Sequence, residues 1–496
     1  MDQDRKTYRL VRLLTGGVTP VALAAAVLLF ARLHDGAWEP GAQAAGICRE
    51  LIAGTTVGRQ ALFGSCWVAP LPVLFYLPFA WLLPEPLAGG AAFFAAWLLV
   101  FWAVREAVKA TGQSGWRIVL AQVAIAGLMT VSRQPQALQV ATALMMGLML
   151  LAAAALADWA AYRRIRDVVT AGAAGAFLVL CGFPAFASAG LAVGLLPFMA
   201  CGNRETRARF QAWLLLGGLP LVYAVSVWLL MNRLILGDAL FFLRSLDFLV
   251  PRLHTFVLAA LSPGLVLLPA LAVTWVCDRR GEGTAGPGGG PTAASAVLIA
   301  FAVALMASGR VLQAFGVGWN TVALHVCALA VLMVALARLR QPVYRLAGAL
   351  ALFVWLSASW FGGGSQGPVA AAERGGTETC RQVEEYVTAR TPYGRVFVLG
   401  YAGLDLLRGY SGERLLPNMD LHVGALRRAY PGQNLYVLVP RPEGIRRAES
   451  VFWKHPDIYE LGGDRLLYAA TFGTWRLFEV ISAPTQEQLD EWKRAR

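Results

Sequence analysis

The chain has 496 residues, of which 57% are hydrophobic and only 15% are charged. Soluble domains carry about a quarter charged residues, so this composition excludes an ordinary soluble protein. The formal net charge of +13 does not indicate nucleic-acid binding here. Many Lys and Arg residues lie in short loops, where they set the orientation of a membrane protein.

Apolar runs long enough to cross a bilayer recur from residue 13 to residue 361. A span needs roughly 17–25 residues, and about eleven runs qualify. The predicted spans are 13–33, 87–105, 116–132, 136–157, 167–183, 185–200, 211–232, 255–277, 293–309, 320–338 and 344–361. The chain is therefore predicted to be a polytopic α-helical membrane protein. Because no small-residue cleavage site follows 13–33, this run is interpreted as a retained first helix.

The apolar stretch WVAPLPVLFYLPFAWLLP (67–84) is interpreted as a juxtamembrane or re-entrant element on the outer side, not as a span. Its prolines remove helix hydrogen bonds that lipid cannot replace. With this element outside, the loops on the side of the N-terminus hold most of the loop Lys and Arg. The positive-inside rule then predicts an N-terminus inside and a C-terminus outside the cytoplasmic (inner) membrane.

Two composition changes divide the chain. The stretch 278–292, DRRGEGTAGPGGGPT, is predicted to be a flexible linker on the inner side. After Phe361, polar helices alternate with short strands, which predicts a small α/β domain. Its predicted helices are 380–391, 419–430 and 443–454, and its predicted strands are 395–401, 434–440 and one or two within 465–481. The expected domains are a membrane domain over 1–361, with a first outer loop over 34–86, and an extracytoplasmic α/β domain over 363–496.

Acidic residues follow the first predicted span directly. Asp35 and Glu39 are four positions apart and share one face if the segment is helical. Arginines suited to bidentate phosphate binding are predicted on the same side: Arg49, Arg59, Arg133, Arg244, Arg252 and Arg310. A carboxylate base could deprotonate an acceptor hydroxyl while arginines stabilise a phosphate leaving group. The alternative stays open that the acids are solvated interface residues and the arginines are snorkelling side chains.

The order of these features resembles the GT-C superfamily of polytopic glycosyltransferases, which includes protein O-mannosyltransferases and aminoarabinose transferases. The segments that carry the resemblance are CRELIAG (48–54) after the first-loop acid, VAPLPVLFYLPF (68–79), SRQPQAL (132–138), GDALFFLRS (237–245) and GRVLQAF (309–315). The resemblance covers most of residues 10–345, and it rests on the shared order of the motifs.

The resemblance implies a fold and a reaction. It implies a GT-C-like membrane domain that moves a sugar from a polyprenyl-phosphate donor to a glycan, lipid or protein acceptor on the outer face. Glu39 would be the base, or would share that role with Asp35. Arg310 and Arg133 would contact the lipid phosphate, and Arg244 and Arg49 are further candidates for this contact.

The sequence departs from the family in ways that affect the chemistry. Relatives often carry a second acid after the SRQ segment, where this chain has Gln136 and Gln139. A divalent cation prefers several hard oxygen ligands, so the sequence does not support a bound metal and predicts a metal-independent enzyme, or one that has lost activity, without other cofactors. Two other function classes stay open. One is a non-catalytic scaffold or assembly protein of envelope glycan synthesis, and the other is a lipid-linked sugar flippase.

The cysteines add one structural question. The chain has seven, and none forms a CxxC pair that would indicate zinc or thioredoxin-like chemistry. Cys48 and Cys66 fall in the same predicted outer loop. Their spacing is equally compatible with a disulfide and with two unpaired thiols.

Overall fold

The fold comes from a computed structural model. It describes residues 18–33, 42–65, 68–84, 87–109, 115–132, 139–162, 164–182, 185, 206–242, 376–407, 410, 412–442, 449–463 and 465–481, and single positions between 302 and 334. The chain divides into two compact units. The first comprises Met1–Gly41, Ala69–Leu230 and Val250–Gly362, and the second comprises Ala42–Val68, Met231–Leu249 and Gly363–Arg496.

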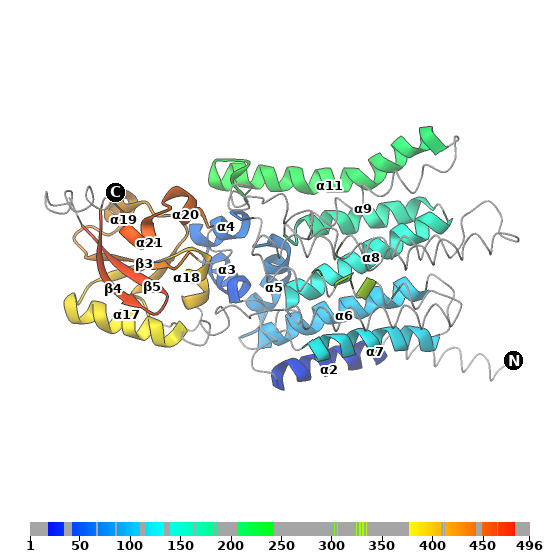
Figure 1. The fold of residues 1–496 in the computed structure, drawn as a ribbon, viewed down its shortest axis with the longest axis horizontal. Helices are drawn as coiled ribbons and strands as arrows, with labels where there is room; N and C mark the ends of the chain where they lie inside the picture. Colours follow the sequence, from blue (N-terminus) through cyan, green and yellow to red (C-terminus); the bar gives the residue numbers. More distant parts are fainter. Residues whose placement is uncertain are drawn as a thin grey trace, which may run out of the picture. The chain divides into compact units, whose positions relative to one another are not determined.

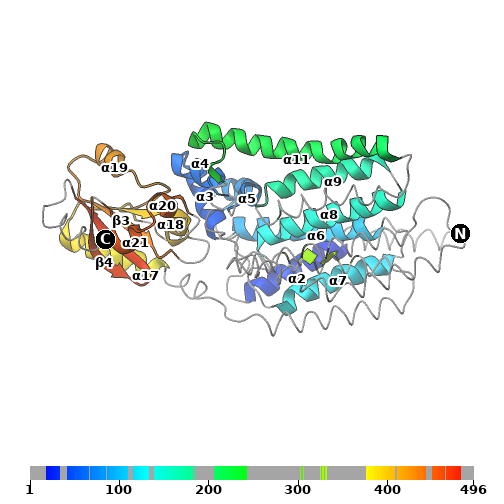
Figure 2. The same ribbon diagram turned by 45° about the horizontal axis from the view of Figure 1, so that its top comes forward.

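The first unit is a bundle of apolar helices that lie side by side (Figures 1 and 2). Its helices are α2 (Thr19–Leu33), α5 (Pro70–Leu82), α6 (Leu87–Lys109), α7 (Gly115–Ser132), α8 (Val140–Tyr162), α9 (Ile165–Val179) and most of α11 (Thr206–Leu236). In the part of the chain that the structure describes, three helices are long and apolar enough to cross a membrane, over Leu87–Val108, Val140–Trp159 and Leu215–Leu236. The predicted spans over 255–277 and 344–361 lie outside the described residues, as do most positions of 185–200, 293–309 and 320–338.

Helix α8 is the centre of this bundle, packed between α6 and α9. Its sequence is apolar on every side, which is typical of a helix buried among other helices. On α6, the rings of Phe93, Trp97 and Phe101 follow one another at four-residue spacing, with centroids 6.2 and 5.9 Å apart. Gln122 of α7 is buried, and its side-chain amide donates a 2.8 Å hydrogen bond to the carbonyl of Phe101. The NH2 group of this side chain is therefore paired inside the apolar packing, whereas its carbonyl oxygen has no partner among the described residues.

The Pro-rich stretch forms the short helix α5, which has 13 residues. A helix of this size is about 20 Å long, less than the roughly 30 Å of a bilayer core. Pro70 and Pro72 lie in its first turn, where a missing N–H costs nothing, while Pro78 lies inside the helix. The N–H of Leu71 donates to the carbonyl of Leu180 at 2.9 Å, which ties the start of α5 to the end of α9.

The second unit contains a five-stranded sheet with the order β2-β1-β3-β5-β4. Its strands are β1 (Arg395–Leu399), β2 (Leu415–Asn418), β3 (Leu435–Pro440), β4 (Leu466–Phe472) and β5 (Trp475–Val480). Strands β2, β1 and β3 are parallel, and β5 and β4 continue the sheet antiparallel. The predicted small α/β domain at the C-terminal end of the chain is confirmed at this level.

Helices cover both faces of the sheet. One face packs against α17 (Gly376–Arg390) and α18 (Gly400–Leu406). The other packs against α19 (Val423–Ala429), α20 (Ser450–Lys454) and α21 (Ile458–Leu461). Strand residues alternate between the two cores: Val396 and Val398 face α17, while Phe397 and Leu399 face α19. This is the three-layer arrangement that β–α–β connections produce.

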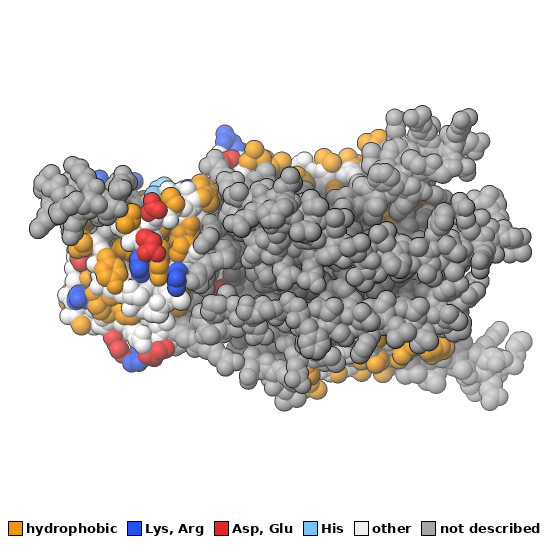
Figure 3. Space-filling model, in the orientation of Figure 1, with side chains coloured by type: hydrophobic (Ala, Val, Ile, Leu, Met, Phe, Trp, Pro, Cys, Tyr) orange, Lys and Arg blue, Asp and Glu red, His pale blue; other side chains and the backbone are white. Residues whose placement is uncertain are grey.

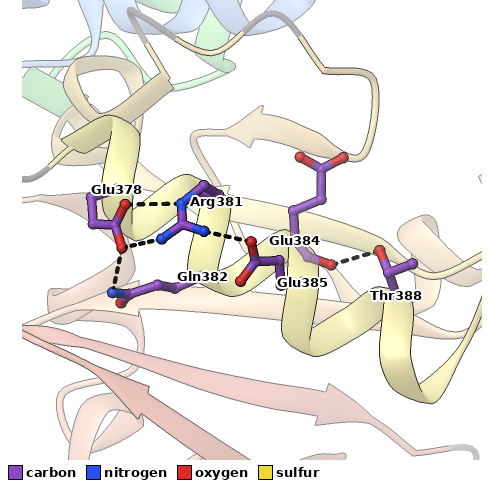
Figure 4. Close-up of polar contacts among 6 residues, drawn as sticks. All are labelled: Glu378, Arg381, Gln382, Glu384, Glu385 and Thr388. Carbon is purple, nitrogen blue, oxygen red and sulfur yellow. Dashed lines mark hydrogen bonds and ion pairs between the residues drawn. The ribbon is translucent and has the colours of Figure 1, made fainter.

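Helix α17 presents a solvated, charged outer surface. Arg381 donates to both carboxylate oxygens of Glu378, at 2.7 and 2.9 Å, and to Glu385 at 2.7 Å (Figure 4). These hydrogen bonds hold the pKa of Glu378 below its ordinary value. Acidic and basic side chains are visible side by side over α17 on the molecular surface (Figure 3). Exposed pairs of this kind favour the helix slightly and do not form a site.

Candidate functional site

The predicted site residues fall mostly outside the part of the chain that the structure describes. This holds for Asp35, Glu39, Arg133, Arg244 and Arg310, whose roles stay predictions. Arg49 is the exception. It lies in the last turn of α3 (Ala42–Ile52), within the CRELIAG segment that resembles the GT-C family. Cys66, which shares the predicted outer loop with Cys48, is also outside the described residues, so the question of a disulfide stays open.

Arg49 connects the first outer loop to the C-terminal domain. Its guanidinium donates a 3.1 Å hydrogen bond to the carbonyl of Leu407, at the C-terminal end of α18. A cation in this position also offsets the partial negative charge of the helix end. At least one N–H group of Arg49 therefore makes a structural hydrogen bond, although the residue is exposed to solvent.

Glu50, the acid next to Arg49, has a local structural role. The hydroxyl of Thr55 donates to the Glu50 carboxylate at 2.8 Å and lies 3.1 Å from the Glu50 carbonyl. Thr55 is also the N-cap of α4 (Thr56–Phe63), and its oxygen accepts the N–H of Gly58 at 3.2 Å. The turn between α3 and α4 is thus fixed by one threonine that contacts both helices.

A buried tyrosine makes the second connection between this loop and the C-terminal domain. The hydroxyl of Tyr401, in the first turn of α18, donates to the carbonyl of Ala61 in α4 at 2.9 Å. The backbone N–H of Tyr401 donates to the Glu449 carboxylate at 3.1 Å. Tyr401 is only 5% exposed, so both hydrogen bonds are shielded from water. Sequence positions 340 residues apart are joined in this way.

A third segment meets the same unit after the end of α11. The ring of Phe241 lies edge-on to that of Trp453, with centroids 5.3 Å apart. The ammonium of Lys454 lies 5.7 Å from the Phe241 ring and 5.4 Å from the Trp453 ring. Phe241 belongs to GDALFFLRS (237–245), another segment of the family resemblance. Two of these segments therefore pack against the same C-terminal domain.

The carboxyl ends of the parallel strands are where an open α/β sheet usually binds ligands. Here the turn after β1 contains Gly400 with φ +75°, and a Cβ at this position would lie 1.7 Å from a Glu449 carboxylate oxygen. The chain's own carboxylate thus occupies the turn. A phosphate bound there, as in dinucleotide folds, would compete with Glu449. The sequence of this domain also contains neither GxGxxG nor GxxxxGK(S/T), the glycine-rich motifs that bind nucleotide phosphates.

Asp420, after the end of β2, contacts a lysine and a histidine. Its carboxylate accepts from the ammonium of Lys454 and lies 3.1 Å from Nε2 of His422. Sequence reasoning missed this group because it predicted a helix from residue 419, whereas α19 begins at Val423. The spacing of Asp420 and His422 was the available signal, since two residues flanking one position of an extended segment point to the same side.

No family model, curated protein or solved structure matches this chain. Within the described residues there is also no group of three or more His, Cys, Asp or Glu side chains placed to hold a metal ion. The geometry around α3, α4 and α18 is therefore the main structural guide to function.

Proposed function

We propose that the chain is a membrane glycosyltransferase of the GT-C type. It moves a sugar from a polyprenyl-phosphate donor to an acceptor on the outer face of the cytoplasmic membrane. Glu39, alone or with Asp35, is the base that deprotonates the acceptor hydroxyl. Arg310 and Arg133 bind the lipid phosphate and stabilise it as a leaving group, with Arg244 and Arg49 as further contacts.

The observation that carries this proposal is the packing of two resemblance segments onto one domain. Glu39 lies three positions before Ala42, the first residue of α3. Helix α3 is held by the bond from Arg49 to Leu407, and α4 by the bond from Tyr401 to Ala61. A catalytic group must be held in place by packed neighbours. The C-terminal domain supplies such an anchor for the segment that follows the proposed base.

The membrane topology is part of the same proposal. It comprises about eleven spans, as run length suggests, with the N-terminus inside and the C-terminal domain outside. The apolar helices of the first unit support a membrane domain. The 13-residue length of α5 supports its place as a juxtamembrane element.

Turnover can be tested with the full chain in mild detergent. A total lipid extract of its own membranes serves as the source of donor and acceptor, and mass spectrometry measures the release of polyprenyl phosphate. We expect Glu39→Gln to abolish release. The matched control is Glu50→Gln, which removes the same charge from a carboxylate that contacts Thr55, and we expect it to retain release.

A non-catalytic scaffold is the second candidate, and the contact of Arg49 favours it. This arginine bonds a carbonyl of the fold, which is sufficient to explain its presence without a phosphate. The scaffold predicts that Glu39→Gln and Glu50→Gln behave like the unchanged chain in every assay. Loss of polyprenyl phosphate release in Glu39→Gln alone would exclude it.

A further inference from the structure

The C-terminal domain contains a pocket of about 820 Å³ on the sheet face that α19 covers. Its walls come from the start of α19, the turn between α20 and α21, and the residues that lead into β4. Pockets that hold small molecules measure about 300–1,000 Å³. This one is therefore large enough for a ligand of the size of a sugar phosphate.

The described lining of the pocket is rich in groups that bind anions. It includes the cationic side chains of Arg428, Lys454 and Arg465 and the imidazoles of His422 and His455. The acidic side chain among the described lining residues is Asp457. Positive charge thus gathers in a concave surface, where it attracts anions more strongly than on a flat one.

The two arginines are available to a ligand. In the described residues neither Arg428 nor Arg465 takes part in an ion pair or a side-chain hydrogen bond, and both are exposed. Other arginines of this domain are engaged: Arg476, for example, bonds Glu460 and the Tyr459 carbonyl. Two guanidinium groups on one pocket, neither of them paired with a described side chain, are suited to bidentate binding of phosphate.

Lys454 is held more firmly than the arginines. Its ammonium donates a hydrogen bond to the Asp420 carboxylate, and the rings of Phe241 and Trp453 lie beside it. Because Asp420 neutralises Lys454, Arg428 and Arg465 are the cationic groups of the pocket left for a ligand, and they outnumber the one described acidic lining residue, Asp457. Lys454 fixes one wall and adds a hydrogen-bond donor there.

We propose that this pocket binds the phosphate group of a small anionic ligand, with Arg428 and Arg465 as the principal contacts. The described lining of the pocket includes none of the predicted glycosyltransferase residues, so the inference goes beyond the proposed function and does not depend on it. Phosphate on a soluble sugar and phosphate on a lipid headgroup share this chemistry, and the test separates them.

The test is isothermal titration calorimetry of the full chain in mild detergent with glucose 1-phosphate and with dihexanoyl phosphatidic acid. We expect at least one probe to bind, and which one binds identifies the source of the phosphate. The double variant Arg428→Gln/Arg465→Gln should weaken this binding about tenfold or more, because hydrogen bonds to charged groups are among the strongest.

The matched control is Arg390→Gln, which removes an exposed arginine from α17 on the opposite face of the sheet. It should bind the probe like the unchanged chain. Absence of binding by both probes would overturn the proposal. Equal binding by the double variant and the unchanged chain would do so too, as would an equal loss in Arg390→Gln, because each result would mean that the pocket arginines make no specific contact.

Discussion

Helix α8 and strand β3 are both buried, but their side chains contribute to the fold in different ways. In the span of α8, 83% of the residues are buried inside the bundle, against 17% for the span of α11. Both helices are apolar, so composition alone does not separate the central helix from the peripheral one. In β3 all six residues are buried, and successive side chains enter two different cores. Position along the strand therefore decides which core each side chain fills. Four substitutions probe the contacts of the two units, from the largest expected effect to the smallest.

The largest effect is expected from Val437→Asp in β3. Val437 is 0% exposed and lies in the core between the sheet and α19. An unpaired buried carboxylate should destabilise the C-terminal domain by about 4 kcal/mol or more. Limited trypsin digestion should then degrade residues 376–481 and leave the apolar helices protected. Leu467→Asp, on the edge strand β4 at 39% exposure, is the control and should resist digestion. Equal resistance of both variants would contradict this account.

A smaller effect is expected from Gly172→Leu in α9. A Cβ at Gly172 would lie 2.7 Å from the carbonyl oxygen of Gly217, so α9 and α11 touch through glycines. Small residues permit this close approach in membrane helices. Overpacking should cost about 1–3 kcal/mol, measured by unfolding in SDS mixed micelles. Gly218→Leu is the control, since a Cβ there meets no described atom within 4 Å. If Gly218→Leu were the more damaging change, the proposed contact would be wrong.

Tyr401→Phe should loosen α4 without unfolding the sheet. It leaves the Ala61 carbonyl without its 2.9 Å hydrogen bond, at a cost of about 1–2 kcal/mol. Hydrogen exchange should rise in Thr56–Phe63. The control is Tyr386→Phe, which removes the 2.7 Å bond from Tyr386 to the Ala469 carbonyl and should raise exchange in β4 instead. Unchanged exchange of α4 in Tyr401→Phe would show that Tyr401 does not anchor the loop.

Arg381→Gln on α17 should have the smallest effect. Arg381 lowers the pKa of Glu378, so any stabilisation exists above the ordinary glutamate pKa and is lost as the pH falls through the lowered value. Because both groups are exposed, solvent screens the pair. At pH 7, and again at pH 3, we expect Arg381→Gln to have the same melting temperature as the unchanged chain measured at that pH. A clear decrease at pH 7 that disappears at pH 3 would show that the pair contributes to stability.

The sequence predicted the sheet except for one edge, the strand β2. The patterns over 395–401 and 434–440 correspond to β1 and β3, the buried parallel strands. Strand β2 was not predicted, because four residues that include Pro417 give little apolar alternation. A strand this short forms because β1 offers it a parallel partner, and such a long-range pairing leaves no local signal.

The contacts of the candidate site were even harder to predict from the sequence than β2, because they arise from tertiary structure. Arg49 was predicted to bind lipid phosphate, and its contact with Leu407 joins positions 358 residues apart. No local pattern predicts that pairing. The contact of Lys454 with Phe241 is equally long-range. In contrast, Asp420 and His422 are near neighbours, and their pairing was hidden by a helix boundary that was predicted too early. The roles of Glu39, Asp35, Arg310, Arg133 and Arg244 stay predictions.

Native mass spectrometry of the full chain, purified from its own membranes in mild detergent, tests the central claim most directly. We predict a retained polyprenyl-phosphate lipid that is lost in Arg310→Ala and kept in Glu39→Gln, because an arginine binds the phosphate and the carboxylate acts only in the reaction. The lipid should also be kept in Arg428→Gln/Arg465→Gln, which separates this site from the pocket of the C-terminal domain. Retention of bulk phospholipid alone, unchanged in every variant, would contradict the glycosyltransferase proposal.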